Sequence, residues 1–297
     1  MIVILNAGAG PPSNGGNGMR SKIAEAFNAV GMSADIMEVS GVDRLIPTIR
    51  KALHKNDEVI IAAGGDGTVS AVAGEMADAG KTMGVLPLGT LNHFAKDVGI
   101  PLELDAAVRT LANGRIEPID VAEVNGRVFV NNSSLGIYPR IVVHRDRQQH
   151  QLNRSRWSAF AWATVLAFRR FPFLRLRISV EGQELDRRTA FLFVGNNEYV
   201  MSGFGIGGRS HLNSGKLGLY LTQRTGRFGL LRLALRALFG RVSQAKDFDA
   251  FTVEEATIES RHKRLLVATD GEVTQMQPPL CYRSRPGALR VIVPKTE

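Results

Sequence analysis

Cysteine is almost absent from this chain. Cys281 is the only cysteine among 297 residues, so no disulfide can form within the chain. That usage is compatible with a reducing compartment. A lone cysteine usually fills space in a core, and we expect Cys281 to do so. The 44% hydrophobic content is enough to build a sizeable core, and the length predicts one large or two medium domains.

Long apolar runs are also missing. The start, MIVILNAGAG, lacks the basic region of a signal peptide and has only four consecutive apolar residues after Met1. Elsewhere Arg or Gly interrupts each apolar stretch before it reaches the roughly 20 residues that cross a bilayer. We therefore expect a soluble, cytoplasmic protein, with at most peripheral contact at the inner face of a membrane.

Acidic residues are outnumbered. The chain has 37 Lys and Arg against 28 Asp and Glu, which gives a net charge of +9 and a pI near 10.0. This balance favours anionic partners, namely nucleic acid, an acidic membrane surface or phosphorylated ligands. The aromatic residues lie in apolar segments rather than among basic residues on strands, and no nucleic-acid module pattern is present. We expect no nucleic-acid partner.

The first half of the chain alternates strands and helices. Apolar runs predict strands at 1–5, 34–39, 57–63 and 82–88. Helical spacing predicts helices at 19–30, around 45–53 and at 68–79. Continuous apolar strands separated by helices indicate a parallel sheet covered on both faces. Ligands of such sheets bind at the carboxyl ends of the strands.

A glycine-rich turn, AAGGDGTVSAVA at 62–73, follows the third of these strands. Its glycines let the backbone approach a ligand closely, and the next helix points its amino terminus, which favours phosphate, at the same spot. Asp66 would repel phosphate, so we interpret it as orienting Mg²⁺, a substrate hydroxyl or a cationic side chain. The simpler alternative is a tight turn that caps a helix.

A second glycine turn, LPLGTLNHFAKDVGIP at 86–101, follows the fourth strand. Gly89 and Thr90 again lie between a strand and a helix, so two phosphate-facing loops could converge from neighbouring strands. Asn92 and His93 open the helix. A lone helical histidine is more often a surface or capping residue, and we assign His93 no chemistry.

Short strand-like runs dominate the second half. They lie at 120–124, 127–132, 174–180, 189–195, 216–222, 248–259, 264–269 and 288–293. Such runs with turn signals between them indicate an antiparallel sandwich or flattened barrel. With GRIEPID (114–120) as the crossover, we predict an α/β domain over 1–118 and a β-rich domain over 119–297, whose last strand could return to the first domain.

Several of these segments together resemble the diacylglycerol kinase catalytic family, which includes bacterial lipid kinases and sphingosine kinases. GGDGTVSAVA followed by LPLGTLNHFAKDVGIP carries the resemblance, and DVAEVNGRVFVNNSSLGIYP, VGNNEY, SGKLGLY and ATDGEV match in order and spacing. GGDGT alone is not specific, because NAD kinases carry it. The resemblance covers nearly the whole chain. It implies an active site in an interdomain cleft, where an ATP γ-phosphoryl group passes to a lipid hydroxyl with the help of Mg²⁺.

The resemblance also implies roles for particular residues. The phosphate cradle would comprise Gly64, Gly65, Asp66, Gly67, Thr68, Ser70, Gly89 and Thr90, with Asn6 and Ser40 on the ATP side. Asp66 would also serve catalysis. Of the carboxylates at 270 and 272, one would accept the proton of the lipid hydroxyl and the other would help to hold Mg²⁺. We favour Glu272 as acceptor, with Asp270 as its rival. The alternative is a plain hairpin turn, because Asp-Gly is a strong turn signal.

The chain departs from the family pattern at two places. Residues 6–10 read Asn-Ala-Gly-Ala-Gly, without the usual proline, serine or lysine, so one phosphate contact is missing or comes from the backbone. Ser214-Gly215 stands where some relatives carry Asp-Gly for a structural Mg²⁺, so we expect no such metal. Two other functions stay open, an NAD-kinase-like enzyme and a non-catalytic lipid-binding regulator. The residues do not identify the lipid, which could be a diacylglycerol, a sphingoid base or another lipid alcohol, or the oligomeric state.

Two apolar segments with basic edges suggest contact with an anionic membrane. They span 153–177 and 226–241, the latter with Arg232 and Arg236. Such helices can lie among lipid headgroups with their arginines on phosphates. Alternatively they pack on the second domain and their arginines extend to water. The basic run at 142–156 is expected to be an exposed loop.

Overall fold

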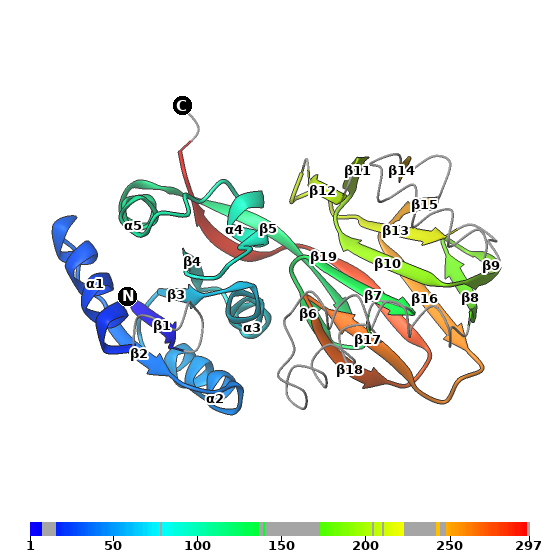
Figure 1. Ribbon diagram of the computed structural model, residues 1–297, viewed down its shortest axis with the longest axis horizontal. Helices are drawn as coiled ribbons and strands as arrows, with labels where there is room; N and C mark the ends of the chain where they lie inside the picture. The colour runs from blue at the N-terminus through cyan, green and yellow to red at the C-terminus, as the bar shows by residue number, and fades with distance from the viewer. Residues whose placement is uncertain are drawn as a thin grey trace, which may run out of the picture.

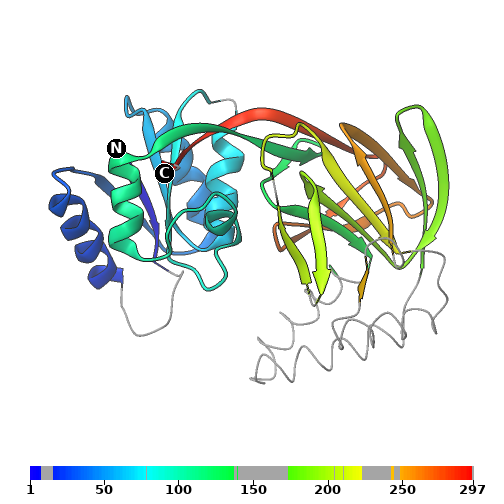
Figure 2. The same ribbon diagram turned by 90° about the horizontal axis from the view of Figure 1, so that it is seen from above.

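The computed structural model describes residues 1–7, 16–77, 79–136, 139, 173–203, 205–209, 211–222, 242–243 and 248–295. They form two layered units, an α/β unit and a β-rich unit (Figure 1). Two long antiparallel strands, β5 (Arg115–Val124) and β19 (Leu280–Val293), run from one unit into the other (Figure 2).

The first unit contains four parallel strands in the order β2-β1-β3-β4. They are β1 (Ile2–Asn6), β2 (Asp35–Val39), β3 (Val59–Gly64) and β4 (Thr82–Pro87). Helices α1 (Gly16–Ala29) and α5 (Leu104–Asn113) contact each other over one face, and α2 (Val42–Leu53) and α3 (Asp66–Met76) over the other (Figure 1). Because both faces are covered, β1, β3 and β4 are buried along nearly their whole length, which explains their continuous apolar sequences.

The strand β19 completes the sheet of the first unit. It pairs parallel to β4, with Arg290 opposite Thr82, and antiparallel to β5. Its register with β5 shifts between Arg285 and Leu289, around Gly287, whose φ is 60°. The predicted domain boundary at residue 118 stays a prediction, because β5 passes through it without a break.

The second unit is a sandwich of two sheets. One sheet continues from β19 through β16 (Glu255–Ser260), β8 (Leu174–Val180) and β9 (Gln183–Thr189). The other has the order β15-β13-β10-β7-β17-β18. Its strands are β7 (Asn132–Gly136), β10 (Phe191–Asn196), β13 (Leu217–Thr222), β15 (Phe248–Val253), β17 (Leu265–Thr269) and β18 (Glu272–Met276). Apolar residues from both sheets form one core, so the predicted α/β plus β-sandwich fold is confirmed.

The remaining elements are short. β6 (Arg127–Phe129) pairs with β5, and α4 (His93–Asp97) follows β4. A small sheet contains β11 (Tyr199–Gly203), β12 (Gly205–Arg209) and β14 (Val242–Ser243).

Three predictions of the sequence were wrong. The predicted strand 127–132 belongs to two strands in different sheets, because β6 ends at Phe129 and β7 begins at Asn132. The run 248–259 is two strands in different sheets, because Glu254 and Glu255 are both exposed, which breaks the alternation and lets the chain cross between sheets. Cys281 is exposed rather than in the core, because it lies between Leu280 and Tyr282, which point inward from β19.

The predicted membrane helix at 153–177 lies outside the described residues as far as 172, and its last residues, 174–177, belong to strand β8 instead. The membrane prediction for 226–241, the loop over 142–156 and the altered residues 8–10 also lie outside the described residues. Within the part of the chain that is described, no helix is both long and apolar enough to cross a membrane.

Candidate active site

The two predicted glycine loops meet at the carboxyl edge of the first sheet. A Cβ added to Gly89 would lie only 2.4 Å from the Cα of Gly65, so no side chain fits between the loops. The amide of Leu88 donates to the carbonyl of Gly64 at 2.9 Å. The loops therefore converge, as expected of turns that follow the adjacent strands β3 and β4.

Asn92 fixes the shape of the second loop. Its Oδ1 accepts a hydrogen bond from Gly89 N at 3.0 Å, and its Nδ2 donates to Gly89 O at 2.9 Å. Its φ of 51° is left-handed, which asparagine tolerates better than most residues. Sequence reasoning missed this role, although asparagine after a glycine turn is a recognised turn signal. Since Asn92 occupies the Gly89 amide, we assign that glycine a role in loop shape. Thr90 and His93 are exposed.

The amino terminus of α3 is open in front of Gly67. A Cβ on this exposed glycine would meet nothing within 4 Å, and its φ lies outside the left-handed region. Neither packing nor backbone conformation therefore requires glycine here. A phosphate approaching the first turn of the helix would require it, because that turn presents free N–H groups.

The neighbouring Asp66 carries a buried oxygen, Oδ1, that has no hydrogen-bond partner among the described residues. A buried carboxylate oxygen without a partner is unusual and indicates a missing ligand. Mg²⁺ typically binds one or two protein carboxylates together with substrate phosphates and waters, so Asp66 beside an open helix terminus fits a Mg²⁺-bound phosphate. Across the described ranges, no three His, Cys, Asp or Glu side chains group as a metal site.

The two residues predicted on the ATP side, Asn6 and Ser40, differ in their contacts. Asn6, at the end of β1, donates from Nδ2 to Thr68 Oγ1 at 3.0 Å and so ties that strand to α3. Thr68 is buried. Ser40 is exposed just after β2, at the same edge of the sheet, because Asn6 and Val39 are partners in the β1–β2 register.

The carboxylate pair lies on the hairpin between β17 and β18. Asp270 and Gly271 have φ values of 47° and 89°, and Thr269 pairs with Glu272, which makes a two-residue turn of the type that favours Asp-Gly. The turn interpretation is therefore correct as geometry. It does not exclude a role in chemistry, because the turn holds its two carboxylates in different surroundings.

Asp270 faces the first unit and is saturated with hydrogen bonds. It accepts one from the hydroxyl of Ser70 in α3, and others from the amides of Val130 (2.9 Å), Asn131 (2.8 Å) and Asn132 (3.0 Å). Burial raises its pKa, while these four bonds oppose that rise. A carboxylate has about four acceptor positions, so Asp270 has no free one. Ser70 and Asp270 thereby link the predicted cradle directly to the predicted carboxylate pair.

Glu272 has a different environment. Its side chain is 55% exposed, and Oε2 pairs with Arg127 Nη2 at 2.7 Å. Arg127 lies in β6 and was not among the predicted site residues. The one feature of the sequence that could have pointed to Arg127 is its place directly after Asn125-Gly126. These two residues form a tight turn, and both have positive φ. The more exposed Glu272 is open to an incoming hydroxyl, whereas Asp270 is fixed.

A cavity of about 380 Å³ lies between these groups. Its lining includes Gly67, Ser70 and Gly74 of α3 on one side, and Arg127, Asp270 and Glu272 on the other. Thr269, which also lines the cavity, has a buried hydroxyl without a hydrogen-bond partner among the described residues.

A fully buried arginine, Arg209, holds the second unit against the first. Its Nη2 lies 2.7 Å from Asp97 Oδ2 of α4, and its Nη1 donates to Val130 O at 2.6 Å. The N–H of Asn131, which belongs to the same peptide group as Val130 O, donates to Asp270 Oδ1. Arg209, which is paired with Asp97 of the first unit, therefore anchors a peptide group that binds Asp270.

An α/β unit with converging glycine loops, facing a β-sandwich across a carboxylate-lined cavity, defines the class of NAD-kinase-like and diacylglycerol-kinase-like folds. The family model described as "Diacylglycerol kinase catalytic domain" matches residues 1–124, and the one described as "YegS C-terminal NAD kinase beta sandwich-like domain" matches residues 140–293. The chain belongs to this family of YegS-type diacylglycerol kinase homologues, as the sequence resemblance predicted.

Individual relatives agree with this placement. A protein of Klebsiella pneumoniae named as a YegS-like lipid kinase is 46% identical over 96 residues, covering 31% of this chain and 32% of the relative. The diacylglycerol kinase of Bacillus subtilis is 35% identical over 114 residues, covering 37% and 38%. The aligned segments thus span about a third of the length of these curated relatives.

The likeness to solved structures covers nearly the whole chain. Two crystal structures of Bacillus anthracis proteins assigned as diacylglycerol kinases superimpose with TM-scores of 0.77 and 0.70, at 21% and 19% identity. In each case 98% of this chain and 96% of the other are covered. At such identity the likeness shows the fold.

Proposed function

We propose that this protein is a lipid kinase, which transfers the γ-phosphoryl group of ATP to the hydroxyl of a diacylglycerol or a related lipid alcohol. The observation that carries the proposal is the hydrogen bond from Ser70 to Asp270 across the cavity. It brings the first turns of the glycine-loop helix and the carboxylate hairpin to one place. Membership of a family of kinases supports the same reaction class.

The first unit would bind the nucleotide. The open N-terminus of α3 at Gly67 would take phosphate oxygens, and Asp66 would hold Mg²⁺ through its unpaired Oδ1. When bound, Mg·ATP supplies the phosphoryl group and neutralises part of its charge. Asp66 fits the metal better than Asp270, because the oxygens of Asp270 already accept four hydrogen bonds.

Glu272 would accept the proton of the lipid hydroxyl. It is the more exposed of the two carboxylates, and Arg127 positions it at the cavity. Asp270 would act as a positioning residue that fixes the hairpin against α3 through Ser70. A proton acceptor normally contributes about 10²–10⁴-fold in rate, so Glu272→Gln should lower kcat by that order and leave ATP affinity nearly unchanged.

The direct experiment incubates the purified chain with labelled ATP, Mg²⁺ and mixed vesicles that contain one lipid alcohol at a time. Phosphorylation of a diacylglycerol, lost in Asp66→Ala while the circular dichroism spectrum is kept, would support the proposal. Turnover of NAD with no lipid product would replace it by an NAD-kinase-like activity. Failure to bind ATP would favour a non-catalytic lipid-binding regulator. A sphingoid base in a parallel reaction tests the alternative lipid class.

A further inference from the structure

The outer face of the second unit's β8–β9 hairpin is rich in arginine. In β8 the burial alternates, so that Leu174, Leu176 and Ile178 point into the core while Arg175 and Arg177 point outward. The register with β9 places Arg188 directly opposite Arg175. Like charges opposite one another on a strand pair are destabilising. Because this arrangement costs folding energy, it indicates a use other than stability.

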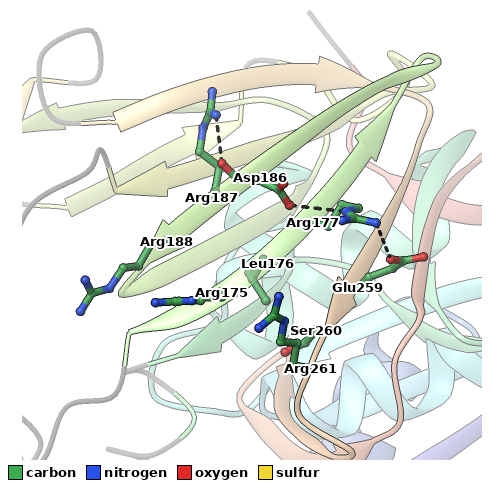
Figure 3. A pocket seen from close by; sticks show the side chains of 9 residues that line it. All are labelled: Arg175, Leu176, Arg177, Asp186, Arg187, Arg188, Glu259, Ser260 and Arg261. Carbon is green, nitrogen blue, oxygen red and sulfur yellow. Dashed lines mark hydrogen bonds and ion pairs between the residues drawn. The ribbon is translucent and has the colours of Figure 1, made fainter.

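These arginines line a groove of about 620 Å³, shown in Figure 3, together with residues of β16. The described residues that line the groove include five arginines and two carboxylates. Arg177 is paired with both carboxylates, Asp186 and Glu259. Arg175, Arg188 and Arg261 have no carboxylate partner among the described residues, and all three are exposed (Figure 3). The guanidinium of Arg188 stacks over the ring of Phe173 at 4.8 Å.

The basic surface continues into the turn between β16 and β17. That turn reads Arg261-His262-Lys263-Arg264, and all four residues are exposed. Arg261 lines both this groove and the smaller hollow formed by the turn, so the two regions are contiguous. We call the set Arg175, Arg188, Arg261, Lys263 and Arg264 the basic face.

We propose that the basic face docks this protein on the headgroups of an anionic phospholipid bilayer. The inference deepens the proposed function, because a kinase for a lipid must work at a membrane surface. The basic turn lies directly before β17 and Asp270 directly after it, so the five residues of this strand, about 17 Å long, connect the docking surface with the cavity. Exposed basic residues without acidic partners are attracted to an anionic surface and can pair with lipid phosphates.

A membrane fits this face better than a nucleic acid. Faces that bind single-stranded nucleic acid interleave aromatic side chains on which bases stack. Among the described residues, those that line this groove include no aromatic side chain, and Phe173 beside it is already covered by Arg188. The acidic residues Asp186 and Glu259 also interrupt the positive charge of the groove. The groove therefore does not offer a continuous positive surface along which a nucleic-acid backbone could lie.

The test measures cosedimentation with phosphatidylcholine vesicles, with and without phosphatidylglycerol. Each basic residue near an anionic surface contributes about fivefold in affinity, so Arg175→Gln with Arg188→Gln should weaken binding to phosphatidylglycerol vesicles roughly 25-fold. Lys263→Gln with Arg264→Gln should do the same. Arg109→Gln with Arg290→Gln removes two exposed charges from the first unit and serves as the matched control, which should bind like the wild type.

The outcomes separate this proposal from the proposed function. Binding requires no turnover, so an inactive protein still reports on the face. Conversely, the variants should phosphorylate a short-chain diacylglycerol dispersed without vesicles at the wild-type rate. Unchanged vesicle binding in both double variants would overturn the proposal. Displacement by millimolar glycerol phosphate would indicate a small-anion site, and retention on single-stranded DNA without vesicle binding would indicate a nucleic-acid partner. Either result would also overturn it.

Discussion

Replacing Gly67 by alanine should stabilise the protein and weaken its binding of nucleotide at least tenfold. The added methyl group would meet no atom within 4 Å, and the backbone there is one that alanine adopts readily. Gly→Ala at a compatible site stabilises a protein by about 0.4–1 kcal/mol, chiefly by restricting the unfolded chain. The unfolding midpoint in urea should therefore rise slightly. The same methyl group would occupy the space through which a phosphate reaches the helix terminus.

The matched control for this change is Gly74→Ala in the same helix. A Cβ there would lie 4.0 Å from its nearest neighbour, Val128 Cβ, which is ordinary contact. An interior helical glycine costs about 0.8–1.0 kcal/mol relative to alanine, so this variant should gain at least as much stability. Gly74 also lines the cavity, but it lies two turns away from the helix terminus at which the phosphate would bind, so the variant should keep the wild-type affinity for ATP.

Calorimetric titration with Mg·ATP and urea unfolding, applied to both variants, give the comparison. Stabilisation in both, with ATP binding weakened at least tenfold only in Gly67→Ala, is the expected pattern. If Gly67→Ala binds ATP as the wild type does, then no phosphate approaches this turn and the nucleotide assignment of α3 is wrong. A loss of stability in Gly67→Ala would instead mean that the open space at the helix terminus has been misjudged.

Three further predictions concern the groups that support the site. Tyr199 donates from its hydroxyl to Asn131 O at 3.2 Å, and burial raises its pKa to about 12. In the unfolded chain the tyrosine loses its proton near pH 10, so the free energy of unfolding should fall by up to about 2.7 kcal/mol as the pH rises from 10 to 12. In urea titrations at alkaline pH, Tyr199→Phe should reduce this dependence of the unfolding free energy on pH. Arg209→Ala should cost about 3–5 kcal/mol of stability, because it leaves Asp97 without its buried partner. A smaller cost in the double variant Arg209→Ala with Asp97→Asn would confirm that the two side chains are energetically coupled. Asn92→Ala should lower the free energy of unfolding in urea by about 2–3 kcal/mol, because it loses the side-chain hydrogen bonds and places alanine in a strained left-handed conformation. Asn92→Gly should lower it less, because glycine adopts that conformation without strain. Equal losses in the two variants would refute the strain argument.

The sheet of the first unit could be predicted from sequence because its physical signal is local. Apolar strands of five or six residues alternate with helices, and glycine turns mark where β3 and β4 end. The short strands of the second unit were harder to delimit. The run 248–259 appeared as one strand, because only the tertiary structure shows that residues before and after Glu254 join different sheets.

The candidate site was predictable in its members but not in its contacts. Motifs identified Asp66, Asp270 and Glu272, yet their spacing along the chain carried no information on which carboxylate is saturated and which is accessible. That distinction depends on backbone amides of residues 130–132, about 140 positions away from Asp270. Arg127 and Arg209 were missed for the same reason, since each acquires its role only from a partner distant in sequence.

The pairing of β19 with β4 has a consequence for the order in which the protein folds. Strands β1 to β4 all end by Pro87, and β19 begins only at Leu280. On the ribosome, the outer edge of β4 therefore stays unpaired until the whole sandwich has been synthesised. An exposed strand edge invites pairing with other chains. A fragment that ends near residue 118 would keep that open edge permanently, and so the α/β unit is a layer of one cooperative molecule rather than a module that can be cut out and reused.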